Sequence, residues 1–235
     1  MARVDPNYGA HFDLSLEIGP AGNDRCVVEA WSALWTCASP HIDGPWEESK
    51  GIGDAQQVLT GERRADRPVH RRYGLLTLGE PFPALPFGFY WIREDEQAVE
   101  EPSDWLTLGI PVTALQLLPS FDGSWSIATQ PWLATICRAL AEIADHINRH
   151  AHLLVGIMGE EVSGCWRCPT PRRTRRADQG YPPLAVLTSE VLDDRGGIVV
   201  ATDLWGQFAP GVAPVTLPSG LLYAPPRPSS ALTGA

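Results

Sequence analysis

The chain has 235 residues, of which 44% are hydrophobic and 20% charged, so it can bury a sizeable core and is not a disordered polypeptide. Its 28 acidic and 18 basic residues give a formal net charge of −10, which argues against generic binding to nucleic acid or to anionic membranes. Five scattered cysteines do not form the dense, even framework of disulfides found in a small secreted domain. The two long uncharged stretches, 105–121 and 204–226, contain prolines and so cannot form membrane-spanning helices. We therefore expect a cytoplasmic protein that does not cross a membrane.

Along the chain, short apolar runs bounded by Gly, Pro and Asp alternate with two segments of helical periodicity. Apolar residues recur at three- and four-residue spacing over 24–35 and 131–149, which predicts two amphipathic helices. The remaining runs are rich in β-branched and aromatic residues and predict strands. In chain order, the expected strands cover residues 11–18, 41–46, 73–78, 87–93, 104–110, 152–158, 184–189 and 197–204.

The order of these elements suggests two similar halves, at about 10–95 and 103–208, each with the plan strand, helix, strand, loop, strand, strand. We expect an α+β fold: a mostly antiparallel sheet with the two amphipathic helices on one face. One domain would then cover residues 1–208. Residues 209–235 are rich in Pro, Gly, Ser and Ala and predict an extended, poorly ordered tail, in which 221–223 could form one short docking segment.

A CxxC motif and a pair of histidines are the first chemical candidates. Cys165 and Cys168 form the motif, and His146 and His150 lie four apart on one face of the second predicted helix. Two imidazoles and two thiolates can hold a structural zinc ion tetrahedrally. The simpler interpretation is that all four residues are unligated, so we expect no cofactor and keep structural zinc as the alternative.

Positive charge is concentrated in two stretches, 63–72 and 167–176, which hold five arginines each. Guanidinium groups grip phosphates and carboxylates through paired hydrogen bonds, so these stretches could form an anion site. No recognised nucleic-acid motif accompanies them, and two solvated loops are the simpler interpretation. The candidate anion-binding residues are Arg63, Arg64, Arg71, Arg72, Arg172, Arg173, Arg175 and Arg176.

The sequence assigns no catalytic residue. It contains no glycine-rich phosphate loop, no metalloprotease HExxH motif and no nucleophile elbow. Six acidic residues between Glu94 and Asp104 read as a solvated loop that joins two strands, since a catalytic pair would need a cleft and a defined separation.

Nine tryptophans are the last unusual feature. Trp31, Trp35 and Trp132 fall on the buried sides of the predicted helices, whereas others can line a groove or an interface. Together with the acidic charge, they favour a non-enzymatic protein that binds another protein through an acidic surface containing tryptophan. In composition the chain resembles bacterial immunity proteins, which mask basic toxins.

Two alternative functions remain. The duplicated plan, with residues 109–112 (GIPV) near the start of the second half, resembles GyrI-like small-molecule-binding domains. That resemblance implies paired modules around an apolar pocket, and hence a ligand-binding module. The second alternative is a protein that contacts an anion or a nucleic acid through the two arginine-rich stretches.

Overall fold

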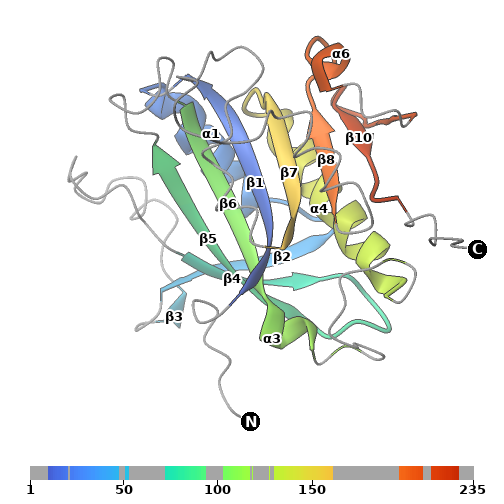
Figure 1. Cartoon of the computed structure of the whole chain (residues 1–235). Coiled ribbons are helices and arrows are strands. Elements are labelled where there is room, and N and C mark those ends of the chain that lie inside the picture. Colours follow the sequence, from blue (N-terminus) through green and yellow to red (C-terminus); the bar gives the residue numbers. More distant parts are fainter. Residues whose placement is uncertain are drawn as a thin grey trace, which may run out of the picture.

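The computed structural model describes residues 10–20, 22–47, 51–52, 72–93, 103–116, 118, 127, 130–160, 196–208 and 213–227. Its strands are β1 (His11–Pro20), β2 (His41–Glu47), β3 (Gly51–Ile52), β4 (Arg72–Thr77), β5 (Leu85–Arg93), β6 (Ser103–Pro111), β7 (Val155–Glu160), β8 (Gly197–Val200), β9 (Val215–Thr216) and β10 (Leu222–Ala224). They form one sheet in the order β3-β2-β4-β5-β6-β1-β7-β8-β10-β9, and neighbouring strands run antiparallel (Figure 1). The fold is therefore mostly antiparallel sheet with few helices, broadly the α+β class expected.

Most expected strands are present, with shifted ends. The strand expected to start at 152 begins at Val155, and the one expected to reach 204 ends at Val200. The chain turns after β8 because the Leu204 N–H donates to the carbonyl of Ala201. The strand expected at 184–189 lies outside the described residues.

The sheet is built around the central pair β1 and β6. Phe12 stands opposite Ile110 and Leu16 opposite Leu106, so apolar side chains of the two strands share one face. All nine residues of β6 are buried, which places this pair at the centre of the molecule. On one side lies the meander β2, β4 and β5, and on the other β7, β8 and β10.

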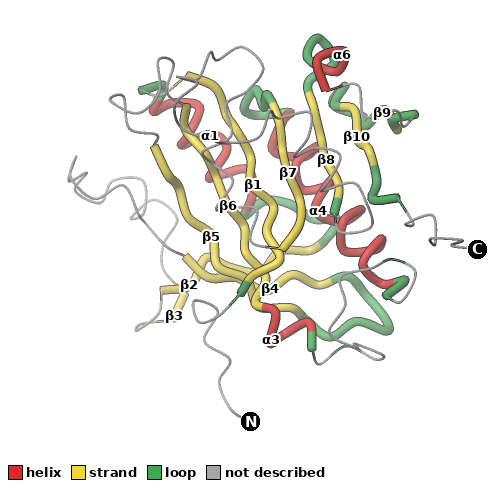
Figure 2. The backbone as a smooth tube through the Cα atoms, viewed as in Figure 1, coloured by secondary structure: helices red, strands yellow, loops and turns green. Residues whose placement is uncertain are grey.

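Two long helices contact each other and the central strands (Figure 2). Helix α1 (Asp24–Leu34) contacts β1 and β6, and helix α4 (Trp132–Asn148) contacts β7 and β8. The Asn23 side chain caps α1 by accepting a hydrogen bond from the Cys26 N–H at 3.3 Å. Both helices match the predicted periodicity, and none of the helices that the structure describes is long and apolar enough to cross a membrane.

Two short helices were not predicted. Helix α3 (Val112–Leu115) follows β6 directly, and helix α6 (Trp205–Phe208) follows β8. Four residues make little more than one helical turn, so neither helix leaves a periodic pattern in the sequence.

Trp31 of α1 and Trp35, which caps the end of that helix, pack against β5 beside glycines of β2 and β4. The Trp31 ring lies 4.6 Å from that of Phe89, and the Trp35 ring lies 5.8 Å from that of Phe87 in a stacked arrangement. Glycine at positions 44 and 74 leaves room for the Trp35 ring, because a Cβ there would approach that ring within 2.6 Å and 2.9 Å respectively. The predicted burial of Trp31 is confirmed, while Trp35 and Trp132 are partly buried.

We expect Gly74→Ala to lower the free energy of unfolding by about 1–3 kcal/mol through overpacking. The added Cβ would lie 2.5 Å from Cζ of Phe87, a distance that real side chains do not tolerate. Chemical denaturation measures the loss. Gly206→Ala is the matched control, since a Cβ there meets nothing within 4 Å. Adding Phe87→Leu to Gly74→Ala should restore part of the loss, and an unchanged stability of Gly74→Ala would contradict this packing.

The segment after Ala209 is not simply an extended tail. Its strand β10 pairs with β8, and Leu217, Leu221 and Tyr223 are buried in the main core. Composition does not register contacts with distant residues, so a Pro-rich background gives no sign that these three apolar side chains are buried. The short docking segment considered at 221–223 is the part that enters the sheet.

Asp104 is a buried acidic residue. It counts among the six acidic residues of the expected loop and also begins the strand expected at 104–110, and it lies in β6 with 1% of its surface exposed. Its carboxylate accepts hydrogen bonds from the Trp91 indole N–H at 3.0 Å and from the Gly22 N–H at 3.2 Å. A buried carboxylate is tolerated where such donors meet it, and these come from distant parts of the chain.

Candidate functional site

The structure has a pocket of about 360 Å³ between α4 and two turns of the first half of the chain. One wall is the turn 38–41 after α1, and a second is the turn 77–79 after β4. The third wall is one side of α4, which contributes Thr135, Arg138, Ala139 and Glu142. We call this hollow the α4 pocket. Its walls carry hydroxyl, imidazole, guanidinium and carboxylate groups beside short apolar side chains.

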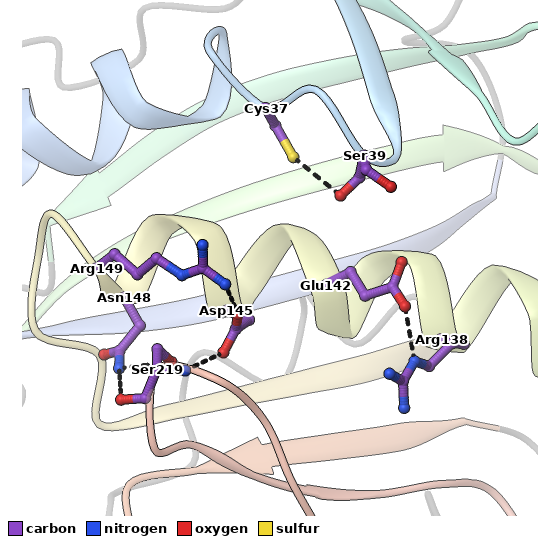
Figure 3. Close-up of polar contacts among 8 residues, drawn as sticks. All are labelled: Cys37, Ser39, Arg138, Glu142, Asp145, Asn148, Arg149 and Ser219. Carbon is purple, nitrogen blue, oxygen red and sulfur yellow. Dashed lines mark hydrogen bonds and ion pairs between the residues drawn. The ribbon is translucent and has the colours of Figure 1, made fainter.

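An ion pair orders the charged wall of the α4 pocket. Arg138 Nε donates to Glu142 Oε1 at 2.8 Å, one helical turn along α4 (Figure 3). The two side chains are 48% and 38% exposed, so solvent and ligands can reach both. In Figure 3 the turn after α1, with Cys37 and Ser39, lies over this part of α4. The pair contributes little to stability at this exposure.

The two buried cysteines that the structure describes are not activated nucleophiles. Cys37 and Cys137 are buried free thiols, and Cys26 is a partly exposed one. Burial raises the pKa of the Cys37 thiol, and it raises that of Cys137 far more. The thiolate is the reactive form, so neither buried residue offers a nucleophile at neutral pH.

The two histidines considered for zinc lie together at the end of α4. The rings of His146 and His150 are 5.3 Å apart, and Nε2 of His146 lies 3.1 Å from the Thr36 hydroxyl oxygen. Because that hydroxyl donates to the carbonyl of Ala33, it is free to accept from a protonated Nε2. Burial, followed by the charges of His150 and Arg149, lowers the pKa of His146.

Cys165 and Cys168 lie outside the described residues, so the four-ligand zinc hypothesis remains a prediction. No group of three metal-type ligands gathers within the part of the chain that the structure describes. Metal content of about one zinc per chain after purification without chelators would support the hypothesis.

Of the eight arginines proposed for anion binding, the structure describes Arg72. It lies on β4 opposite Phe89 of β5 and is partly buried. The others lie outside the described residues: Arg63, Arg64, Arg71, Arg172, Arg173, Arg175 and Arg176. The structure therefore does not bring the two arginine-rich stretches together or separate them.

A buried polar row on β1 is a feature that the sequence reasoning missed. Asp13, Ser15 and Glu17 are at most 1% exposed and point away from the face that carries Phe12 and Leu14. The Ser15 and Thr107 hydroxyls lie 3.1 Å apart, and the Ser103 hydroxyl donates to Glu17. The signal was present in HFDLSLEI, whose strict alternation puts every polar residue on one face.

Glycines flank the aspartate of this row. Asp13 stands opposite Gly109 of β6 and Gly159 of β7. A Cβ at Gly109 would lie 2.7 Å from Oδ1 of Asp13, so glycine at that position gives the carboxylate its space. The side chain of Asp13 is thus accommodated by both neighbouring strands.

The spacing of the polar row does not suit a paired-carboxylate hydrolase. Asp13 and Glu17 lie four residues apart on one strand, which separates their Cα atoms by about 13 Å. Glycoside hydrolases place their two carboxyl groups about 5–9.5 Å apart. A serine nucleophile needs a general base within hydrogen-bond distance. Among the described contacts, the partner of the Ser15 hydroxyl is the Thr107 hydroxyl, which is not a base.

Comparisons with known proteins add little about chemistry. No family model matches the chain, and no curated protein matches it by sequence. A solved structure, "Pseudomonas aeruginosa T6SS protein PA0821", aligns with a TM-score of 0.32 and 10% identity. The alignment covers 84% of this chain and 59% of that one.

Proposed function

We propose that the protein acts by binding another protein through an acidic surface, in the manner of an immunity protein that masks a basic partner. The observation that carries the proposal is how charge is distributed over the helices. Their three exposed arginines each pair with a carboxylate four residues away, at 2.7 Å, 2.8 Å and 2.7 Å. The pairs are Arg25 with Glu29, Arg138 with Glu142 and Arg149 with Asp145.

Each of these pairs is neutral as a unit, so the three arginines add no net positive charge to this part of the surface. Asp43, Glu80 and Glu160 are exposed on the strands and turns, and the whole chain carries −10. A surface of this kind attracts a basic protein from a distance, which raises the association rate and suppresses wrong partners of like charge. The three free cysteines among the described residues agree with the cytoplasmic location that the proposal carries.

We expect the purified protein to capture a basic protein encoded beside its own gene, with an association rate that falls at least about tenfold between about 50 and about 300 mM NaCl. Surface plasmon resonance measures the rate. Asp43→Lys with Glu80→Lys should slow association further, whereas the control Asp43→Asn with Glu80→Gln should slow it less. An association rate independent of salt, or equal rates for all variants, would overturn the acidic-surface proposal.

A small-molecule-binding module is the second candidate function, and the α4 pocket favours it. The pocket lies between turns of the first half and the long helix of the second half, and Glu142 stands in its wall. The GyrI-like plan predicted a pocket in this place. The resemblance implies an apolar pocket, whereas the lining of this one mixes polar with apolar groups.

The finer architecture belongs to the same proposal. We propose that α1 and α4 form a layer over one face of the sheet and that the halves 10–95 and 103–208 are a pseudo-repeat. Two observations support it: β1 and β6 are neighbours at the centre of the sheet, and a long helix follows each of them before a three-stranded meander.

Contact with an anion or nucleic acid through the arginine-rich stretches remains the third candidate function.

A further inference from the structure

We infer that the α4 pocket binds a small monocarboxylate whose carboxylate is gripped by Arg138. This inference rests on the second candidate function, the small-molecule-binding module, and names its ligand class. It is independent of whether the acidic surface binds a protein.

Glu142 engages one edge of the Arg138 guanidinium. Arg138 donates its hydrogen bond to Glu142 from Nε, at 2.8 Å. A guanidinium has further N–H groups on its two terminal nitrogens, and their paired edge matches the two oxygens of a carboxylate.

The remaining walls suit a ligand with a short apolar body. Pro40, Leu78 and Ala139 offer apolar contact, while the hydroxyls of Ser39 and Thr77 offer hydrogen bonds. A volume of about 360 Å³ lies near the lower end for small-molecule sites, so the ligand has a single ring or a short chain. The carboxylate oxygens of Glu142 can accept a hydrogen bond from a hydroxyl at the far end of such a ligand.

Charge selects a monoanion over a phosphate. A phosphate monoester brings roughly two negative charges at neutral pH, and it would face Glu142 in the same wall. The chain as a whole carries −10, which repels multiply charged anions at long range. Arg138 and Glu142 cancel each other, so one bound carboxylate brings this wall to a net charge of about −1 and a phosphate monoester to about −2. The monoanion therefore has the smaller electrostatic cost.

The test uses 4-hydroxybenzoate as the probe and the whole chain as the protein. An NMR titration that monitors amide chemical shifts should give a dissociation constant on the order of 1 mM. The largest shifts are expected at Thr77, Leu78 and Gly79. Arg138→Gln should weaken binding at least about tenfold, the size expected for a lost charge-assisted hydrogen-bond pair. Arg138→Lys should recover only part of the affinity, because an ammonium has no paired edge.

Arg25→Gln is the matched control. Arg25 makes the same kind of ion pair, Nε to Glu29 Oε1 at 2.7 Å, on the other long helix and away from the α4 pocket. The control should bind 4-hydroxybenzoate as the natural chain does. Equal losses in both variants would show a general charge effect and overturn the assignment to Arg138.

The neutral analogue 4-hydroxybenzamide distinguishes a failure of the monocarboxylate inference from a failure of the small-molecule-binding function. If 4-hydroxybenzamide binds as tightly as 4-hydroxybenzoate with the same amide shifts, the pocket binds small molecules but the monocarboxylate assignment is wrong. Tighter binding of inorganic phosphate would also overturn the assignment. If none of these compounds shifts the amides of 77–79 at about 10 mM, both the inference and the small-molecule function fail.

Discussion

Replacing Leu140 with alanine is expected to lower the free energy of unfolding by about 2–5 kcal/mol. Leu140 is fully buried in the main core cluster, on the side of α4 that faces the sheet. Removing its isobutyl group loses apolar burial and leaves a cavity that the antiparallel strands can close only partly, because neighbouring core side chains are already packed. Urea denaturation followed by circular dichroism measures the change. The slope of unfolding free energy against urea concentration should be the same in both proteins.

Arg138→Gln, two residues earlier on α4, is the control for this prediction. The Arg138 side chain is 48% exposed, and an exposed ion pair contributes about 0–1 kcal/mol. At about 2–4 °C per kcal/mol for a chain of this size, the two variants should also separate clearly in thermal melting. If Leu140→Ala and Arg138→Gln lowered stability equally, α4 would not be the core helix described here.

The regular elements could be predicted because their information is local. Three- and four-residue spacing in 131–149 gives a helix with Ile136, Leu140 and Ile147 on one side, and α4 buries those residues. Alternation in 11–18 gives a strand, and β1 is that strand. In both cases the periodicity of the side chains matches the geometry of the backbone, so no knowledge of distant contacts is required.

What the sequence could not supply is which distant segments meet. Tyr223 sits in a Pro-rich stretch and becomes buried because β10 pairs with β8. Asp104 reads as one of six loop acids and becomes buried because the Trp91 indole and the Gly22 N–H converge on it. Burial of both residues depends on contacts between residues far apart in the chain, which composition does not register.

The α4 pocket illustrates the same limit for function. Its walls come from 38–41, 77–79 and 135–142, three segments that no motif connects. The sequence drew attention instead to clustered residues, the CxxC motif and the arginine-rich stretches, which lie largely outside the described residues. A binding site assembled from single residues of separate elements becomes visible only once the fold brings them together.

The polar row of β1 differs, because its signal was present and went unused. The alternation that predicts the strand also predicts that Asp13, Ser15 and Glu17 share a face. Polar residues on one face of a strand usually indicate solvent, and here they are buried instead. The position of β1 at the centre of the sheet decides the outcome, and strand order is not encoded in alternation.

The second large effect is expected at Asp145, which attaches the C-terminal segment to α4. Its carboxylate accepts hydrogen bonds from the Ser219 N–H and from Arg149, both at 2.7 Å, and its residue is 4% exposed (Figure 3). Asp145→Ala leaves the Ser219 N–H without its acceptor, which should cost about 1–3 kcal/mol. Hydrogen exchange at the β10 amides, Leu222 to Ala224, should accelerate more than exchange in β1, because β10 follows the turn that Asp145 holds.

The same residue makes stability depend on pH. Burial alone would raise the pKa of Asp145, but hydrogen bonds from Ser219 and Arg149 outweigh it and lower the pKa below its ordinary 3.8. A carboxyl whose pKa is lower in the folded state stabilises fully above the unfolded value, and that stability is lost as pH falls through the folded pKa. Asp145→Asn should therefore flatten the decline in unfolding free energy below about pH 4.

Glu142→Gln changes another ion-paired carboxylate of α4 and is the control for both Asp145 variants. It should leave the hydrogen exchange of β10 as it is. A decline in Asp145→Asn as steep as in the natural chain would show that other carboxylates govern the acid stability of this fold.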